Sequence, residues 1–237
     1  LAIQDLSEAG AQPMASPSGR WQVVYNGEVY NVEALRQALG ATRWRGHSDT
    51  EVICAALDQW GFEATLPRLR GMFAIAAWDT SREALWLARD RLGQKPLYWS
   101  ERGGLTLVAS ELRGIRAHPD APASIDPNAV ARLIRRQSVG APRSILEGVR
   151  QLPPGCWLRL TEGSVVGPQA YWTAQPEAPA FEGIEAAEEA VEATLTEAVR
   201  LRTLSDVPLG TLLSGGVDSS LITALLVHAG HRVRTFI

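Results

Sequence analysis

The sequence predicts an α/β protein built in two parts. Up to residue 172, helical patterns alternate with short apolar runs of strand length that turn residues separate. From residue 184, a long amphipathic helix precedes a strand, a glycine loop, a second helix and a further strand. The first pattern indicates antiparallel sheets covered by helices, and the second indicates the start of a parallel α/β unit.

The composition excludes several classes of protein. The 237 residues carry 23 Lys and Arg against 26 Asp and Glu, a net charge of −3, which implies no basic surface for nucleic acid. No apolar run approaches the ~20 residues of a membrane span. Two cysteines do not make a disulfide framework, so a reducing compartment, the cytoplasm, is expected.

The first elements follow from aromatic, β-branched and capping residues. Trp21–Gly27 predicts a strand that ends in a turn-forming Asn-Gly pair. A helix is expected over 31–40 with Asn31 as its N-cap, and another over 48–61 with Ser48 opening a capping box.

The middle of the chain reads as short strands. Four apolar runs predict antiparallel strands joined by hairpins: Met72–Asp79, Ala84–Asp90, Leu97–Glu101 and Leu105–Ser110. Asp126, followed by Pro127, opens a helix that ends near Gln137. Cys156–Thr161 predicts one more strand, and the Pro- and Ala-rich stretch 173–183 predicts a linker.

The last part begins with an amphipathic helix from Ile184 to about Leu204. A buried strand is expected over Pro208–Leu213, a helix from about Ser219 to His228, and a strand near Val233–Ile237. Strand, glycine loop, helix and strand in this order are typical of a nucleotide-binding unit.

The glycine loop after residue 212 carries the most specific chemistry. Glycines let backbone N–H groups approach an anion closely, and a helix N-terminus favours phosphate. The loop lacks the Lys of a Walker motif, and Asp218 beside phosphates requires a bridging divalent cation, so Mg²⁺ is predicted. A plain glycine turn is the alternative. The predicted ATP and pyrophosphate site comprises Leu213, Ser214, Gly215, Gly216, Asp218 and Ser219, with Asp218 also the predicted metal ligand.

This loop resembles the pyrophosphate loop of the ATP pyrophosphatase superfamily, and residues 205–220 resemble glutamine-dependent asparagine synthetases more specifically. Upstream motifs resemble landmarks of class II glutamine amidotransferase domains, in the family's order: Tyr25–Asn31, His47–Glu51, Gly71–Ala74, Trp78–Asp79, Ala88–Asp90, Gly93, Lys95–Tyr98, Ala109–Glu111, Leu152–Gly155 and Tyr171–Trp172. The resemblance implies a four-layer αββα N-terminal-nucleophile hydrolase-like domain over 1–172, a linker over 173–183, and the first part of an ATP pyrophosphatase-like synthetase domain over 184–237.

The resemblance also implies a glutamine site. The side-chain amide of Asn26 and the backbone N–H of Gly27 would stabilise the oxyanion, while Glu28 and Asp49 would recognise the α-amino end of glutamine. Two plainer interpretations stay open. Asn26 and Gly27 could form an ordinary hairpin turn, and Asp49 could serve the dipole of its helix.

The chain departs from the family in one respect. It contains neither the N-terminal Cys nucleophile nor the Arg that pairs with the carboxylate of glutamine. Cys54 and Cys156 fall in a predicted helix and strand, where a free Cys acts as a small buried hydrophobe. The chain is therefore expected to be truncated at both ends and inactive by itself.

The resemblance implies glutamine-dependent asparagine synthesis. Glutamine would yield ammonia, ATP and aspartate would form an aspartyl-adenylate and pyrophosphate, and ammonia would displace AMP. The expected partners are therefore glutamine, aspartate and ATP, with a homodimer usual for bacterial members. Two alternatives stay open: a relative acting on another carboxylate, by β-lactam closure or by amidating sugars or peptides, and a non-catalytic amidotransferase-like binding module.

Overall fold

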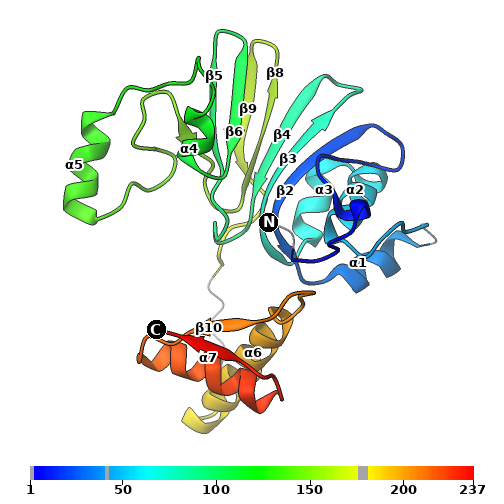
Figure 1. The fold of residues 1–237 in the computed structure, drawn as a ribbon, viewed down its shortest axis with the longest axis vertical. Helices are drawn as coiled ribbons and strands as arrows, with labels where there is room; N and C mark the ends of the chain where they lie inside the picture. Colours follow the sequence, from blue (N-terminus) through cyan, green and yellow to red (C-terminus); the bar gives the residue numbers. More distant parts are fainter. Residues whose placement is uncertain (1–2, 41–42, 176–180) are drawn as a thin grey trace. The chain divides into compact units, whose positions relative to one another are not determined.

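The computed structural model describes residues 3–40, 43–175 and 181–237 (Figure 1). The chain divides into two compact units, one over Ala11–Ala174 and the other over Leu1–Gly10 with Gln175–Ile237. Among the described residues, no helix combines the length and the apolar character needed to cross a membrane.

The larger unit is built on a six-stranded antiparallel sheet with the order β1-β2-β3-β4-β8-β9. Its strands are β1 (Met14–Ala15), β2 (Trp21–Val29), β3 (Gly71–Asp79), β4 (Ala84–Arg89), β8 (Cys156–Thr161) and β9 (Ser164–Ala170). Three helices lie together beside β2–β4: α1 (Val32–Leu39), α2 (Asp49–Trp60) and α3 (Phe62–Thr65) (Figure 1). The alternation of Trp21, Val23 and Tyr25 into the core explains this layer, because successive strand residues face opposite sides.

A second antiparallel sheet of three strands has the order β6-β5-β7. It consists of β5 (Tyr98–Arg102), β6 (Leu105–Ala109) and β7 (Arg150–Gln151). Buried side chains from both sheets form one core cluster: Ala74, Leu87, Leu97, Trp99, Leu152, Leu158 and Leu160. Two further helices lie between β6 and β7 in the sequence, α4 (Leu112–Arg116) and α5 (Pro127–Arg136). The predicted α/β class, with antiparallel sheets and helices, is confirmed.

Several local expectations were wrong. Asn26 and Gly27 form no turn, because β2 continues through them to Val29, paired with β3. Asn31 stands at the N-cap of α1 without capping it, because its side chain bonds to the backbone of Arg68 and Arg70. The edge strand β9 was not predicted, since its mostly exposed residues carry no buried apolar pattern.

The smaller unit contains α6 (Ile184–Leu201), β10 (Gly210–Leu212), α7 (Val217–His228) and β11 (Arg234–Phe236). The strands β10 and β11 pair in parallel, as the sequence pattern indicates. The expectation that the first of these strands is buried was wrong, since Leu212 of β10 is 79% exposed. A residue near the start of the chain belongs here, since the backbone N–H of Asp5 donates to Oδ2 of Asp206 at 2.8 Å.

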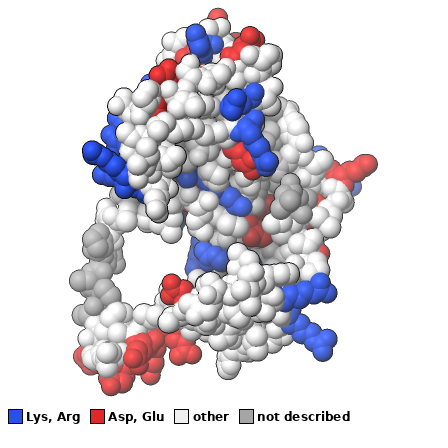
Figure 2. Space-filling view, turned by 60° about the vertical axis from the view of Figure 1, so that its left-hand side comes forward, with Lys and Arg blue, Asp and Glu red and all other residues white. Residues whose placement is uncertain are grey.

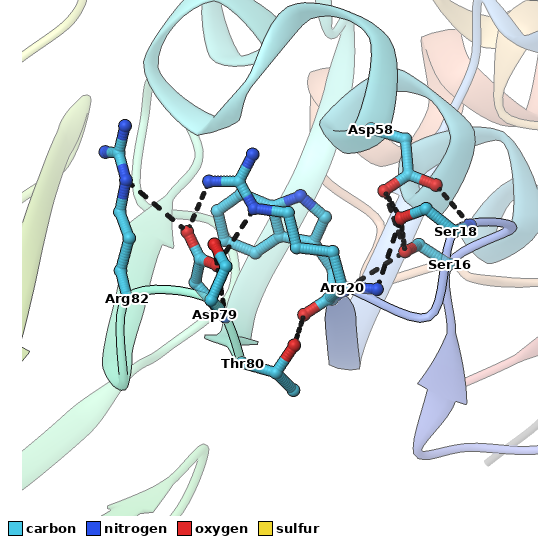
Figure 3. A network of polar contacts seen from close by, with 9 residues as sticks. Ser16, Ser18, Arg20, Asp58, Asp79, Thr80 and Arg82 are labelled. Carbon is cyan, nitrogen blue, oxygen red and sulfur yellow. Dashed lines mark hydrogen bonds and ion pairs between the residues drawn. The ribbon is translucent and has the colours of Figure 1, made fainter.

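Charged side chains of both signs are interspersed over much of the surface that Figure 2 draws, and acidic ones gather at its lower edge. The start of β2 carries the best-defined ion pair. Arg20 donates from Nε and Nη2 to the two oxygens of Asp79, at 2.9 and 2.6 Å, and Asp79 is fully buried (Figure 3). This bidentate pair joins β2 to the end of β3, where Trp21 and Asp79 are register partners.

Candidate functional site

The predicted glutamine-binding residues Asn26, Gly27 and Glu28 lie near the end of β2 that is opposite to Arg20. Asn26 is exposed, on the face of β2 that does not contact the helices, whereas Glu28 is 6% exposed. The strict alternation of buried and exposed residues along β2 stops at Gly27, after which Glu28 and Val29 are both buried.

Gly27 is required by packing rather than by a left-handed backbone. A Cβ on Gly27 would overlap the carbonyl oxygen of Met72 and lie 2.7 Å from Cα of Phe73. Gly71 is equally confined by the backbone of Glu28 and Val29 on the facing strand. The glycines therefore leave room for the backbone of the facing strand at the predicted oxyanion site, where a side chain would collide with it.

The side chain of Asn26 reaches the second sheet. Its Nδ2 donates to Oγ of Ser110 at 2.9 Å, and Ser110 follows directly after β6. The two residues are 84 positions apart in the sequence. The sequence motif around Ser110 marked it as a landmark, but nothing local predicted this contact.

Asp49 is the first residue of α2, where the hydroxyl of Ser48 accepts a hydrogen bond from the N–H of Thr50 as an N-cap. Oδ2 of Asp49 accepts from the hydroxyl of Tyr25 at 2.8 Å and from the N–H of Val29 at 2.9 Å. These two donors flank Asn26–Glu28, so Asp49 lies beside the other predicted glutamine residues.

The carboxylate of Asp49 is 5% exposed and, among the described residues, has no Lys or Arg partner. Burial raises its pKa, and the hydrogen bonds from Val29 and Tyr25 only partly offset this effect. Burial also raises the pKa of Tyr25 well above its usual range, and the negative charge of Asp49 adds to the shift. Asp49 and Tyr25 therefore form a desolvated pair of acidic groups, and no Lys or Arg among the described residues pairs with either.

Gln12, which the sequence analysis did not single out, joins the same strand and helix. Its Oε1 accepts from the N–H of Tyr25 at 2.6 Å, and its Nε2 donates to Oγ1 of Thr50 at 3.3 Å. The side chain of Gln12 thus connects β2 to the first turn of α2, through two residues that are neighbours of Asp49: Tyr25 in space and Thr50 in the sequence. No sequence pattern identifies such a contact, because Gln12 lies in a loop.

Another group of family landmarks forms a single cluster around Asp90, which is fully buried. Its carboxylate accepts from four backbone N–H groups, those of Phe73, Leu92, Gln94 and Lys95. The neighbouring Arg89 donates to three carbonyl oxygens, those of Gly93, Lys95 and Leu152. Tyr171 donates its hydroxyl hydrogen to the carbonyl of Arg89. The residues of these landmarks therefore stabilise one conformation of the loop that follows β4.

Both cysteines lie in the predicted helix and strand, but only Cys54 is buried as expected, whereas Cys156 is partly buried. Cys54 is buried in α2, where burial raises the pKa of its thiol to about 12. Cys156 begins β8, and burial raises its pKa as well. A raised pKa disfavours the nucleophilic thiolate, so neither thiol is suited to attack an amide.

The predicted phosphate loop connects β10 to α7. Leu213 follows β10, and its N–H donates to the carbonyl of Phe236 at 2.7 Å. Gly215 has a φ of +78°, which favours glycine, and α7 begins directly after Gly216. The helix starts at Val217, two residues earlier than expected, so Asp218 lies in its first turn.

Hydroxyl groups line the same loop. The Oγ atoms of Ser214 and Ser219 are 3.1 Å apart, and Ser219 donates to the carbonyl of Gly216. The loop therefore gathers hydroxyls and the N-terminus of a twelve-residue helix, a combination suited to anionic oxygens. Within the described ranges, no group of three or more His, Cys, Asp or Glu side chains could hold a metal ion.

Comparison with known proteins identifies both parts of the chain. A family model described as glutamine amidotransferase domain matches residues 1–172, and one described as asparagine synthase matches residues 190–237. The chain belongs to the glutamine amidotransferase domain family, and its residues 190–237 match the start of an asparagine synthase domain. Its relatives include asparagine synthetases, which are ligase-type enzymes.

Two relatives with different names illustrate what the chain is similar to. Asparagine synthetase [glutamine-hydrolyzing] 3 of Bacillus subtilis is 37% identical over 241 residues, which cover 98% of this chain and 38% of the relative. Amidase chry2 of Gibberella zeae is 33% identical over 233 residues, covering 96% of this chain and 34% of the relative. The chain therefore spans little more than a third of the length of these relatives.

Solved structures support the fold of this family member. Glutamine phosphoribosylpyrophosphate amidotransferase from B. subtilis, complexed with ADP and GMP, aligns with a TM-score of 0.51 at 16% identity. The alignment covers 98% of this chain and 49% of that structure. The similarity extends to the fold of an N-terminal-nucleophile amidotransferase.

Proposed function

We propose that the complete gene product hydrolyses glutamine and uses the ammonia to convert aspartate, activated by ATP, into asparagine. Residues 1–172 would form the amidotransferase domain, residues 173–183 the linker, and residues 184–237 the first part of the synthetase domain. Cytoplasmic location and a homodimeric state belong to the same proposal.

One observation carries the glutamine half of this proposal. Asp49 is a buried carboxylate held by two neutral donors, the hydroxyl of Tyr25 and the N–H of Val29, and no Lys or Arg in the described part of the chain pairs with it. A buried, unpaired charge is costly, and an ammonium group from a ligand would relieve that cost. The α-amino group of glutamine is such a cation, and Glu28 adds a second buried carboxylate on the adjacent strand.

The chemistry follows from the neighbouring residues. Attack of a thiolate on the side-chain amide of glutamine forms a tetrahedral oxyanion, which donors placed beforehand stabilise more than they stabilise the substrate. The side-chain amide of Asn26 and the N–H of Gly27 are neighbouring donors on one strand. The family resemblance implies an N-terminal Cys as the nucleophile. The thiols of Cys54 and Cys156 are not suited to that role, because burial raises their pKa.

The ATP half rests on the loop between β10 and α7. The hydroxyls of Ser214 and Ser219 and the N-terminus of α7 are suited to the pyrophosphate oxygens of ATP. Transfer of AMP to a carboxylate supplies a leaving group that ammonia can displace, which a free carboxylate lacks.

Magnesium fits this loop only together with phosphate. Asp218 contributes one oxygen-bearing side chain, and Mg²⁺ in nucleotide sites is held by one or two carboxylates plus phosphate oxygens and water. Asp218 would hold the ion when ATP is present. A bound Mg²⁺ would reduce the repulsion between Asp218 and the phosphates.

A second acceptor has specific support. Relatives named as amidases, chry2 of Gibberella zeae and chyE of Penicillium rubens, are each 33% identical to this chain over at least 95% of its residues. A gene product with the same two halves could therefore amidate a different carboxylate.

The test measures glutamine hydrolysis, pyrophosphate release and amide formation by the complete gene product. With ATP, Mg²⁺ and glutamine, aspartate should yield asparagine and pyrophosphate in equal amounts. Pyrophosphate release with another carboxylate, but not with aspartate, would favour the second acceptor. Absence of glutamine hydrolysis would overturn the proposal.

Two variants separate the halves. Asp49→Asn should strongly reduce synthesis at glutamine concentrations below KM and preserve synthesis from added ammonia, because only glutamine binding needs the carboxylate. Asp218→Asn should reduce synthesis from both nitrogen sources, because it acts on ATP. Equal loss of both activities in Asp49→Asn would contradict the assigned roles.

A further inference from the structure

We propose that Ser110 is a positioning residue that holds the side-chain amide of Asn26 in the orientation required for oxyanion stabilisation. The inference deepens the proposed function and rests on it. Ser110 would act through Asn26 and would not touch the substrate itself.

The geometry of Asn26 makes such a partner necessary. Asn26 is exposed, and its side chain has one hydrogen bond among the described residues, from Nδ2 to Oγ of Ser110 at 2.9 Å. An exposed amide without a fixed partner rotates about its terminal torsion, and a rotating donor does not form a preorganised site. The bond to Ser110 fixes the plane of the amide.

The donor count permits both roles at once. A side-chain amide carries two N–H groups on one nitrogen. One N–H of Asn26 donates to Ser110, which leaves the other for a developing oxyanion. Ser110 therefore orients the group without consuming its capacity to stabilise negative charge.

The position of Ser110 is itself well fixed. It lies between the last residue of β6, Ala109, and the start of α4, whose Ile115 is 1% exposed. A Cβ on Gly114 of α4 would lie 2.9 Å from Cβ of Ala109, so helix and strand are in close contact. The second sheet thus supplies a rigid support for a side chain on the first sheet.

The experiment compares steady-state glutamine hydrolysis in the complete gene product and its Ser110→Ala and Ser110→Thr variants. Ser110→Ala should lower kcat about tenfold with KM for glutamine unchanged, because an oxyanion contact acts in the transition state. Ser110→Thr keeps the hydroxyl and should restore most of kcat. Ser18→Ala is the matched control, because Ser18 bonds to Asp58 near the opposite end of β2 and should leave both constants unchanged.

A double-mutant cycle with Asn26→Ala provides the decisive measurement. If Ser110 acts through Asn26, then adding Ser110→Ala to Asn26→Ala should cause no further loss of kcat. Additive losses, or a Ser110→Ala enzyme with the kcat of the unsubstituted protein, would overturn the role of Ser110 and leave the proposed function intact. Absence of glutamine hydrolysis in the unsubstituted protein would overturn both.

Discussion

A buried carboxylate lies close to each end of strand β2. One of them is paired with a cationic side chain, and the other accepts hydrogen bonds from neutral groups. Asp79 is fully buried beside Arg20, whose guanidinium forms two hydrogen bonds to it (Figure 3). Asp49 is 5% exposed and is held by the hydroxyl of Tyr25 and by a backbone N–H. Among the described residues, Asp79 has a cationic partner and Asp49 has none.

The pKa values express this difference. Burial tends to raise the pKa of Asp79, but the hydrogen bonds and charge of Arg20, with hydrogen bonds from Ser81, outweigh it and lower the pKa to about 2. At Asp49 burial prevails and the pKa is raised. Asp79 therefore stabilises the folded state as an ion, whereas the charge of Asp49 costs stability and is available to a ligand cation.

The largest effect on stability is expected at Gly27 of β2, where an added side chain would collide with β3. Gly27→Ala should lower the free energy of unfolding by about 3 kcal/mol, because the added methyl overlaps the backbone of Met72 and Phe73. Chemical denaturation measures the change. Gly140→Ala is the control, since a Cβ there meets no atom within 4 Å. Equal stability of the two variants would show that the backbone of Met72 and Phe73 does not exclude a side chain at position 27.

Asp49→Asn should separate function from stability. We expect kcat/KM for glutamine to fall about 100-fold through KM, because the substrate ammonium loses its buried partner. The free energy of unfolding should not decrease, since the charged form was disfavoured by burial. Steady-state kinetics and denaturation of the same preparation check both statements. Asp79→Asn should show the reverse, with lower stability and unchanged KM.

Arg20→Ala tests the other end of β2. Removing the guanidinium leaves Asp79 buried and without its bidentate partner, so the free energy of unfolding should fall by about 2 kcal/mol. Arg82→Ala is matched, because Arg82 approaches Asp79 only to 3.9 Å and its side chain is 59% exposed. Its effect should stay below about 0.5 kcal/mol. Equal losses in the two variants would contradict the importance of the bidentate geometry.

The smallest effect concerns pH. Because the pKa of Asp79 is lowered to about 2 in the folded protein, its stabilising contribution is complete above its ordinary pKa of about 4. That contribution is lost as the pH falls from about 4 to about 2. The difference in unfolding free energy between the unsubstituted protein and Arg20→Ala should therefore shrink over this interval. A difference independent of pH would sink the assignment to Asp79.

The fold was largely predictable where local patterns coincide with tertiary structure. The apolar runs at 72–79, 84–90 and 156–161 each lie on strands within a residue of the expected limits. Strand β9 was missed, because an edge strand with exposed residues lacks a buried face. The Asn-Gly pair was misread as a turn, because its glycine serves a contact with Met72, distant in sequence.

The roles of individual site residues remain predictions, and sequence reached them to different degrees. Motifs marked Asn26, Gly27, Glu28 and Asp49 together, and the structure brings Asp49 beside that strand. The sequence motifs could not indicate that Tyr25 and Val29 form hydrogen bonds to Asp49, or that Ser110 accepts one from Asn26. Those partners depend on how a strand, a helix and a second sheet pack, which no local pattern encodes.

Sequence alone determined the α/β class, the order of the two parts, and which polar groups occur at the predicted glutamine and ATP sites. These follow from short-range properties: side-chain periodicity, turn and capping residues, and motifs of contiguous residues. Tertiary structure alone decided which buried carboxylate has its own cation. Charge compensation depends on distances of a few ångströms between residues far apart in the chain, as between Arg20 and Asp79, 59 positions apart.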